Sequence, residues 1–258
     1  MTKLDHYSQT FQWTLRMLSV VFVFGLFYGS NSTAKAATDE EVAVSLATLL
    51  RASRAVISKN QKHINDPSVG DKGLSSATVV KTAKENYKKA TGSSLDDIDP
   101  GSVQGKLLQA ELQAITEVMD TAQENINRKD VGLKGFLPAV FARLVTQKFK
   151  ASSAGVATLK LTAPKEWVRN RANRPDKWEH NVIEKTFKSP DHPRNKHVTE
   201  ATKVKGKDAF RLILPEYYKK SCLGCHGEPK GELDITGGKK EGGKLGQLGG
   251  AISVVIFK

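Results

Sequence analysis

The segment Cys222-Leu-Gly-Cys225-His226 constrains this 258-residue chain more than any other feature, because it contains the only two cysteines of the sequence. Three kinds of chemistry use two cysteines at this spacing. An oxidised redox pair usually opens a helix after a strand in a βαβ unit, and the sequence around this segment shows no such unit. A zinc site needs four ligands at recurring spacings, and the sequence has no second cysteine pair.

The third chemistry is covalent attachment of a c-type haem, and the histidine favours it. Both cysteines then form thioethers with the vinyl groups of the haem, and the histidine that follows at once reaches the iron. The sequence therefore predicts one haem c, attached to Cys222 and Cys225, with His226 as the proximal ligand of the iron.

Residues 1–36 have the pattern of a secretory signal peptide. A mildly basic start ends at Arg16, an apolar run covers residues 17–28, and Ala34-Lys35-Ala36 has the form of a cleavage site. An uncleaved membrane anchor is the alternative, but the apolar run is well short of the roughly 20 residues that a span needs. We expect cleavage near Ala36 and a periplasmic or otherwise exported chain with no transmembrane segment after processing.

The chain is strongly basic, with a formal net charge of +13. About +11 remains without residues 1–36, which contain three basic residues and one acidic residue. In a cytosolic protein this charge would suggest nucleic acid as a partner, but an exported chain rarely meets it. The lysines are scattered, so a solvated basic surface is expected, and an acidic protein or an anionic lipid remains a possible partner.

Helical patterns fill the first half of the chain and strand patterns most of the second. The capping box that begins at Thr38 predicts a helix to about His63, and three more helices follow, over about 75–92, over 103–127 and from Pro138. Strands are predicted at 156–162, 198–204, 209–214 and 251–257, with a short helix over 178–187. We therefore expect an α+β fold with a helical region at 37–152 and an antiparallel sheet at 153–258.

The position of the cysteine segment argues against the common haem architectures. Compact electron carriers have this motif near the N-terminus and a methionine ligand far downstream, whereas here only 32 residues follow His226 and none is methionine. A second known architecture is a helical bundle that carries the motif on its last helix. The glycines that follow the motif here would destabilise such a helix. We expect the haem on a loop between strands. Ten of the 21 glycines lie between Gly224 and Gly250, which we interpret as backbone folded closely around a flat macrocycle, a flexible surface loop being the alternative.

Four stretches together resemble a known family of exported c-type haem domains with a PAS-like fold, catalogued mainly as a domain of unknown function. Its members occur alone and as input modules of sensor kinases and chemotaxis receptors. The stretches are residues 169–179 (RNRANRPDKWE), 210–215 (FRLILP), 221–229 (SCLGCHGEP) and 249–254 (GGAISV). The resemblance implies a PAS-like antiparallel sheet that carries haem c and is preceded by long N-terminal helices. Some members also have a cysteine on an N-terminal helix as second iron ligand, and this chain has none to offer.

The second ligand of the iron therefore stays open. Met119 is the only methionine after the signal segment, and His63 ends the first predicted helix. The remaining choices are an empty or water-filled site or one of three histidines in polar surroundings, namely His180, His192 and His197. His/Met ligation would raise the reduction potential, whereas an open site would allow small gases to bind.

Three arginines are candidates for bidentate hydrogen bonds to the haem propionates, namely Arg169, Arg174 and Arg211. The alternative for each is an ordinary surface arginine. We expect residues 169–179 to form an ordered loop against the haem, with Asp176 capping the helix that follows and Trp178 packed on the porphyrin edge or in the core.

Two functions are compatible with these features. The first is a periplasmic monohaem c-type cytochrome that passes single electrons to a redox partner protein. The second is a haem-based redox or gas sensor that acts through a partner protein such as a receptor. A haem enzyme would need acid–base groups beside an open iron site, and no convincing set is visible, so we expect no enzymatic activity. The oligomeric state is open, and a dimer is possible.

Overall fold

The four long helices begin at the residues that the sequence indicates. The protein is described here by a computed structural model that covers residues 36–258, so the predicted signal peptide lies outside the described residues except for Ala36. Thr38 and Glu41 form the capping box, and the side chains of Ser75 and Ser102 cap the next two long helices. The helical elements are α1 (Asp39–Lys59), α2 (Gln61–Ile64), α3 (Ser76–Thr91), α4 (Val103–Ile126) and α5 (Pro138–Ser152).

The strands form one antiparallel sheet in the order β1-β4-β3-β2. Their bounds are β1 (Ala157–Thr162), β2 (Val198–Val204), β3 (Lys207–Tyr217) and β4 (Leu248–Phe257). Lys205 and Gly206 both have positive φ, as a two-residue hairpin turn requires. The predicted α+β class is confirmed, while the PAS-like character stays a prediction. β3 runs three residues beyond its predicted end, because Pro215 and Glu216 still pair with β4.

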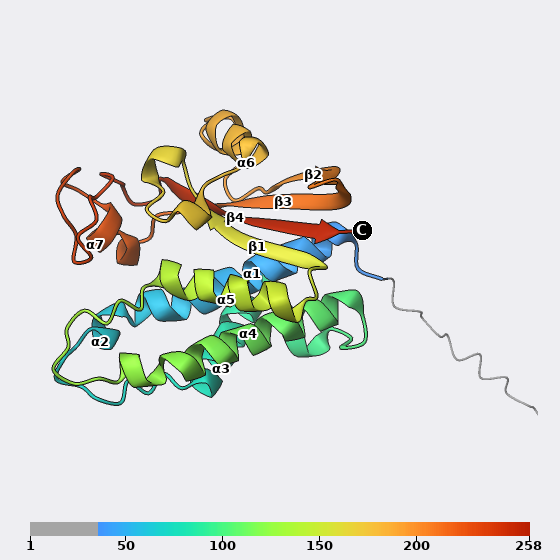
Figure 1. The fold of residues 1–258 in the computed structure, drawn as a ribbon. Coiled ribbons are helices and arrows are strands. Elements are labelled where there is room, and N and C mark those ends of the chain that lie inside the picture. Colours follow the sequence, from blue (N-terminus) through green and yellow to red (C-terminus); the bar gives the residue numbers. More distant parts are fainter. Residues whose placement is uncertain (1–35) are drawn as a thin grey trace, which may run out of the picture. The chain divides into compact units, whose positions relative to one another are not determined.

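The sheet is covered on both faces, because alternate residues of each strand point to opposite sides. On β3, Leu212 and Leu214 belong to the large core with the long helices, while Ile213 belongs to a smaller cluster with Val182 and Phe187. Figure 1 shows the long helices on one side of the sheet and α6 (Lys177–Asn181) on the other. A π-helical stretch, Val182–Phe187, continues α6.

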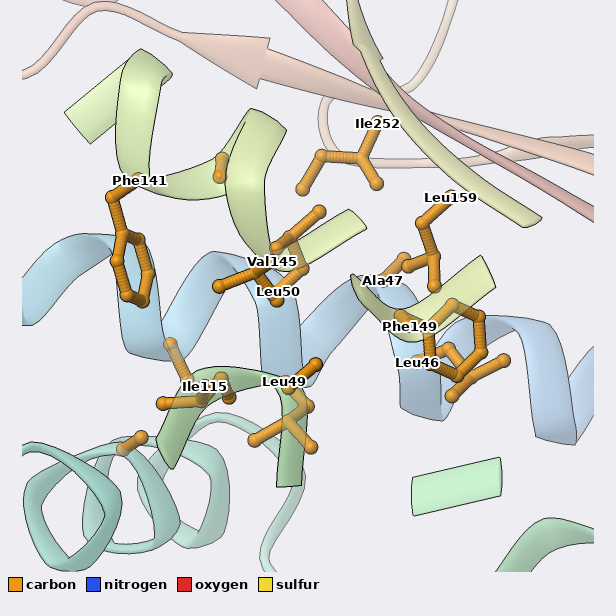
Figure 2. Close-up of a cluster of buried hydrophobic side chains, with 14 of the residues drawn as sticks. Leu46, Ala47, Leu49, Leu50, Ile115, Phe141, Val145, Phe149, Leu159 and Ile252 are labelled. Atoms are coloured by element: carbon orange, nitrogen blue, oxygen red, sulfur yellow. The ribbon is translucent and has the colours of Figure 1, made fainter. Parts of the chain in front are cut away.

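Helix α1 is the centre of the large core. Leu46, Leu49 and Leu50 are fully buried, and because every residue from Ser45 to Leu50 is buried, this part of α1 is covered on all sides, which agrees with the two apolar stripes of its sequence. Figure 2 shows these side chains between Phe141 and Phe149 of α5, Ile115 of α4 and strand residues such as Ile252. The helices and the sheet therefore share one core.

Residues 218–247 connect β3 to β4 and contain both cysteines; we call this segment the CxxCH loop. Its ends are joined by backbone hydrogen bonds from Tyr218 N to Gln247 O (2.9 Å) and from Gly246 N to Tyr218 O (2.8 Å). The loop thus leaves and re-enters adjacent strands at one end of the sheet, beside the label α7 in Figure 1. Among the described residues, no helix has both the length and the apolar character needed to cross a membrane.

Candidate functional site

The two cysteines lie on consecutive turns of helical backbone. A 3-10 turn (Lys220–Cys222) leads into α7 (Leu223–His226), which places residues three apart on one side. Both thiols are free and half-buried. Burial raises the pKa of the Cys225 thiol, and the nearby carboxylate of Asp234 adds to this effect. The geometry gives two thiols that form no disulfide at one short turn, directly before a histidine, and the backbone N–H of Lys219 donates to Sγ of Cys222 (3.4 Å).

The ring of His226 is held from one side and free on the other. Its Nδ1 atom lies 2.8 Å from Oε2 of Glu241. Because a carboxylate can only accept, Nδ1 carries the proton, and in the neutral ring the lone pair is therefore on Nε2. Among the residues that the structure describes, Nε2 has no hydrogen-bond partner, and the side chain is 36% exposed. The lone pair on Nε2 of His226 is thus available to bind a metal.

Tyr218 supports the same ring by stacking. The ring centroids of Tyr218 and His226 are 5.4 Å apart, and the planes are inclined by 21°. Burial raises the pKa of Tyr218, so its hydroxyl stays protonated at neutral pH. Trp167 lies beyond it, with its ring centroid 6.4 Å from that of Tyr218. The imidazole therefore has an aromatic neighbour on one face and a carboxylate at its edge.

Arg169 fastens the CxxCH loop from outside. Its guanidinium donates to Oε1 of Glu241 (3.1 Å), to Asp234, and to the carbonyl oxygens of Cys225 (2.8 Å) and Lys239 (3.0 Å). Burial opposes ionisation of Asp234, but hydrogen bonds from Thr236 and Arg169 outweigh it and hold its pKa well below the usual range. One arginine thus fixes the backbone next to His226 and the carboxylate that holds the histidine.

The glycines of the loop allow close approach, but the approach that the structure shows is to Tyr218. A Cβ at Gly243 would lie 2.3 Å from the Tyr218 ring, and one at Gly249 would lie 2.6 Å from it. A side chain at either position would displace the tyrosine that stacks on His226. Gly243 of the loop and Gly249 of β4 are therefore packed on a tyrosine ring, and the folding of this glycine-rich backbone around a macrocycle stays a prediction.

The exposed surface of the loop is unusually apolar. Leu233, Ile235 and Leu245 are 60–69% exposed, and they are three of the six large hydrophobic side chains that are exposed in residues 36–258. Contiguous exposed apolar patches mark binding surfaces, whereas single exposed apolar side chains are ordinary. Two thiols without a disulfide and an available Nε2, on a loop with three exposed apolar side chains, fit a haem c. In residues 36–258, no three histidine, cysteine, aspartate or glutamate side chains gather as a protein-only metal site requires.

The structure separates the two arginines that the sequence analysis grouped together. Arg169 contacts the CxxCH loop, whereas Arg211, in the middle of β3, pairs with Asp176 (2.6 Å) and Glu179 (3.5 Å). The Arg211 guanidinium also lies over the ring of Trp178, 4.3 Å from its centroid. The buried guanidinium of Arg211 thus joins β3 to the start of α6 through these ion pairs. The side chain of Arg174, the third candidate, is exposed.

The residues considered as second iron ligand have other contacts or are packed in the core. Met119 is fully buried in the large core, where it packs as an ordinary apolar side chain. Three of the candidate histidines have other partners, since His63 contacts Lys72 O, His192 contacts Lys196 O and His197 contacts Glu40, and the fourth, His180, is on α6. Among the described residues, no hydrogen bond or ring contact joins any of these histidines to the CxxCH loop.

The end of α1 is the helical segment in contact with the cysteine turn. Ser58 Oγ lies 2.8 Å from Ser221 Oγ, and Arg51 and Arg54 both pair with Glu216 at the end of β3. Burial opposes ionisation of Glu216, but the two arginines outweigh it and lower its pKa. These contacts fix the turn relative to the helical core.

Sequence reasoning missed Glu241, Tyr218 and Asp234. Glu241 is between Lys240 and Gly242 and has the local pattern of a solvated loop residue, but its side chain is only 7% exposed. A carboxylate in a glycine-rich segment, 15 residues after a predicted metal ligand, was the only available signal.

Comparison with known proteins gives one match. Residues 32–256 match the Tll0287-like family, described as Tll0287. No curated protein and no solved structure matches the chain.

Proposed function

The chain belongs to the Tll0287-like family, and we propose from its site that it is a periplasmic monohaem c-type cytochrome that transfers single electrons. The observation that carries this proposal is that two thiols and one imidazole lie together at a single helical turn. Cys222 and Cys225 are free, and His226 has its Nδ1 proton fixed by Glu241, which leaves Nε2 available. This is the set of groups that attaches a haem covalently and ligates its iron.

In this role each residue has a defined task. Cys222 and Cys225 would hold the haem through thioethers, in each of which S–H is added across one vinyl group. His226 would bind the iron through Nε2, and Leu233, Ile235 and Leu245 are exposed apolar side chains that could cover apolar surface of the haem. When bound, the haem supplies an iron that accepts one electron from a reduced partner protein and gives it to an oxidised one. The chain is then a carrier with an external partner, and we assign it no enzymatic activity.

A second candidate function is a haem-based redox or gas sensor that acts through a partner protein. It is favoured by the positions of the other possible iron ligands, since Met119 is in the core and His63 is bonded to a backbone carbonyl. An iron with no second protein ligand can bind small gases. The absorption spectrum with and without CO separates the two. A six-coordinate spectrum that CO does not change supports electron transfer, and a high-spin spectrum that CO shifts supports sensing.

The proposal is tested by exporting the chain in a host that attaches c-type haem. The wild type is expected to carry one haem per chain that resists acid–acetone extraction. Cys222→Ser and Cys225→Ser should each leave a single thioether, and the double variant should lose covalent haem completely. Covalent haem in the double variant, or none in the wild type, would show that the proposal is wrong.

A further inference from the structure

The carboxylate of Glu241 joins the candidate iron ligand to a fixed cation. Its Oε2 lies 2.8 Å from Nδ1 of His226, and its Oε1 lies 3.1 Å from Nε of Arg169. The side chain is 7% exposed, so little water competes for either oxygen. Each oxygen thus has one partner, and the carboxylate cannot rotate without losing both.

We propose that Glu241 is a positioning residue that fixes the orientation and tautomer of His226 and, through its negative charge, keeps the reduction potential of the bound haem low. This inference rests on the proposed function, because it concerns His226 as an iron ligand. It assigns a role to a residue outside the CxxCH motif.

Orientation follows from the geometry. A histidine bound to the iron through Nε2 can still rotate about its axis unless its other nitrogen is held. Here Nδ1 donates to Glu241, and Tyr218 stacks on the ring face at 5.4 Å. Arg169 holds Glu241 and also donates to the carbonyl of Cys225, the residue directly before His226. The acceptor and the backbone that carries the histidine are therefore fixed by the same guanidinium.

The effect on potential follows from charge. A hydrogen bond from a metal-bound histidine to a carboxylate makes the ring more basic, and so a better donor to the metal. Ferric haem has one more positive charge than ferrous haem, so a stronger donor and a nearby negative charge both favour the ferric state. Glu241 supplies both, which lowers the reduction potential. The positive charge of Arg169 offsets part of the negative charge of Glu241 and so limits the decrease in potential.

The test compares Glu241→Gln with Glu232→Gln in the haem-loaded, full-length exported protein. Glutamine at 241 keeps an oxygen that can accept from Nδ1 but removes the charge. Glu232 is a matched control, because it is in the same loop and pairs with Lys240 but does not contact His226. The measurements are haem content by mass, the midpoint potential, and the iron–histidine stretching frequency of the ferrous protein by resonance Raman spectroscopy.

We expect Glu241→Gln to retain covalent haem and to shift the ferric-to-ferrous equilibrium at least tenfold toward ferrous, which corresponds to about 59 mV upward for one electron. The iron–histidine frequency should fall. Glu232→Gln should leave the frequency unchanged and move the potential much less. A Glu241→Gln protein with wild-type frequency and potential would overturn the inference while the proposed function stands.

A second measurement keeps the inference testable if Glu241→Gln does not mature. In the Cys222→Ser/Cys225→Ser chain, which cannot attach haem, nitrogen NMR of His226 reports the tautomer directly. We expect a proton on Nδ1 when Glu241 is present. A proton on Nε2 would overturn the inference. Absence of covalent haem in the wild type would instead contradict the proposed function, and the tautomer would still be measurable.

Discussion

Arg169 and Asp234, 65 residues apart in the chain, form an ion pair in which the carboxylate is fully buried. From the sequence, Arg169 is a candidate for a hydrogen bond to a haem propionate, with an ordinary surface arginine as the alternative. In the structure its guanidinium is already occupied by two carboxylates and two backbone carbonyls of the CxxCH loop. Arg169 therefore acts on the candidate site by holding the loop and the partner of His226.

Arg169→Ala should lower the reduction potential and weaken the fold. Removing the cation leaves the full charge of Glu241 on His226, which favours ferric haem. It also leaves Asp234 buried without its cation, which should cost about 3 kcal/mol of unfolding free energy, since Asp234 keeps its bonds from Thr236. Redox titration and chemical denaturation check both effects. Arg171→Ala removes a neighbouring exposed arginine and should change neither value.

Asp234→Asn should make the protein less stable at neutral pH, and this loss should shrink in strong acid. The pKa of Asp234 is lowered in the folded state, so its ionised form contributes stability that is fully present above its unfolded pKa of about 3.9 and is lost as the pH falls from there through the much lower folded-state value. We expect the variant to lose about 1.5–3 kcal/mol at pH 7. Denaturation at pH 7 and pH 2 measures this difference, because only a pH close to the low folded-state value removes most of the contribution. A difference that is equally large at pH 2 would contradict the assignment.

His226→Ala should leave thioether formation possible and remove the proximal iron bond. The reduced spectrum should become high-spin, and the potential should shift. The matched control is His192→Ala, which removes a histidine bonded to Lys196 O within its own loop. An unchanged spectrum in His226→Ala would point to another histidine as the proximal ligand.

Asp176→Ala should affect stability and not the haem. Asp176 accepts from Glu179 N (2.9 Å), as predicted, and also pairs with Arg211. Loss of the cap should cost about 1 kcal/mol. Asp176→Asn keeps an oxygen for the cap and should cost less. Thermal unfolding of both variants tests the order, and the absorption spectrum should stay that of the wild type.

Glu111→Met should stabilise the protein, increasingly so as the pH rises. Within residues 36–258, neither carboxyl oxygen of Glu111 has a hydrogen-bond partner, both are buried, and burial raises the pKa of this side chain well above the usual value. A carboxyl with a raised folded-state pKa favours folding at low pH, and this contribution is lost as the pH rises above the unfolded value. We expect a gain of about 1–3 kcal/mol near pH 8. Glu111→Gln is the control, since it stays polar and should gain less.

Electron exchange with an anionic reagent should slow as salt is added. The formal net charge is +13, and a pocket beside Trp167 is lined by Arg169, Lys230, Lys239 and Lys240 together with Glu166 and Glu241. Screening of this surface weakens the attraction of anions. Stopped-flow rates with ferricyanide should fall with ionic strength, whereas rates with a cationic cobalt complex should rise. Equal salt dependence for both reagents would show that the basic surface does not steer the encounter.

The sequence by itself determined the features that depend on local spacing. Apolar residues at steps of three and four specified the long helices, and Thr38, Asp176 and Pro138 fixed the starts of three helices, because capping acts within one turn. Alternation of apolar and polar residues specified the strands, since successive side chains of a strand point to opposite faces. The spacing of Cys222, Cys225 and His226 likewise depends on a single turn.

The tertiary structure alone decided which distant side chains meet. Arg169 and Arg211 looked equivalent in the sequence, yet one contacts the CxxCH loop and the other pairs with Asp176. The contact between Glu241 and His226 spans 15 residues of glycine-rich loop with no periodic pattern. Such a loop has no local rule that fixes its path. Its path follows from the pairing of β3 with β4, the packing of glycines on Tyr218 and the bonds of Arg169, and these form only when the whole chain is folded.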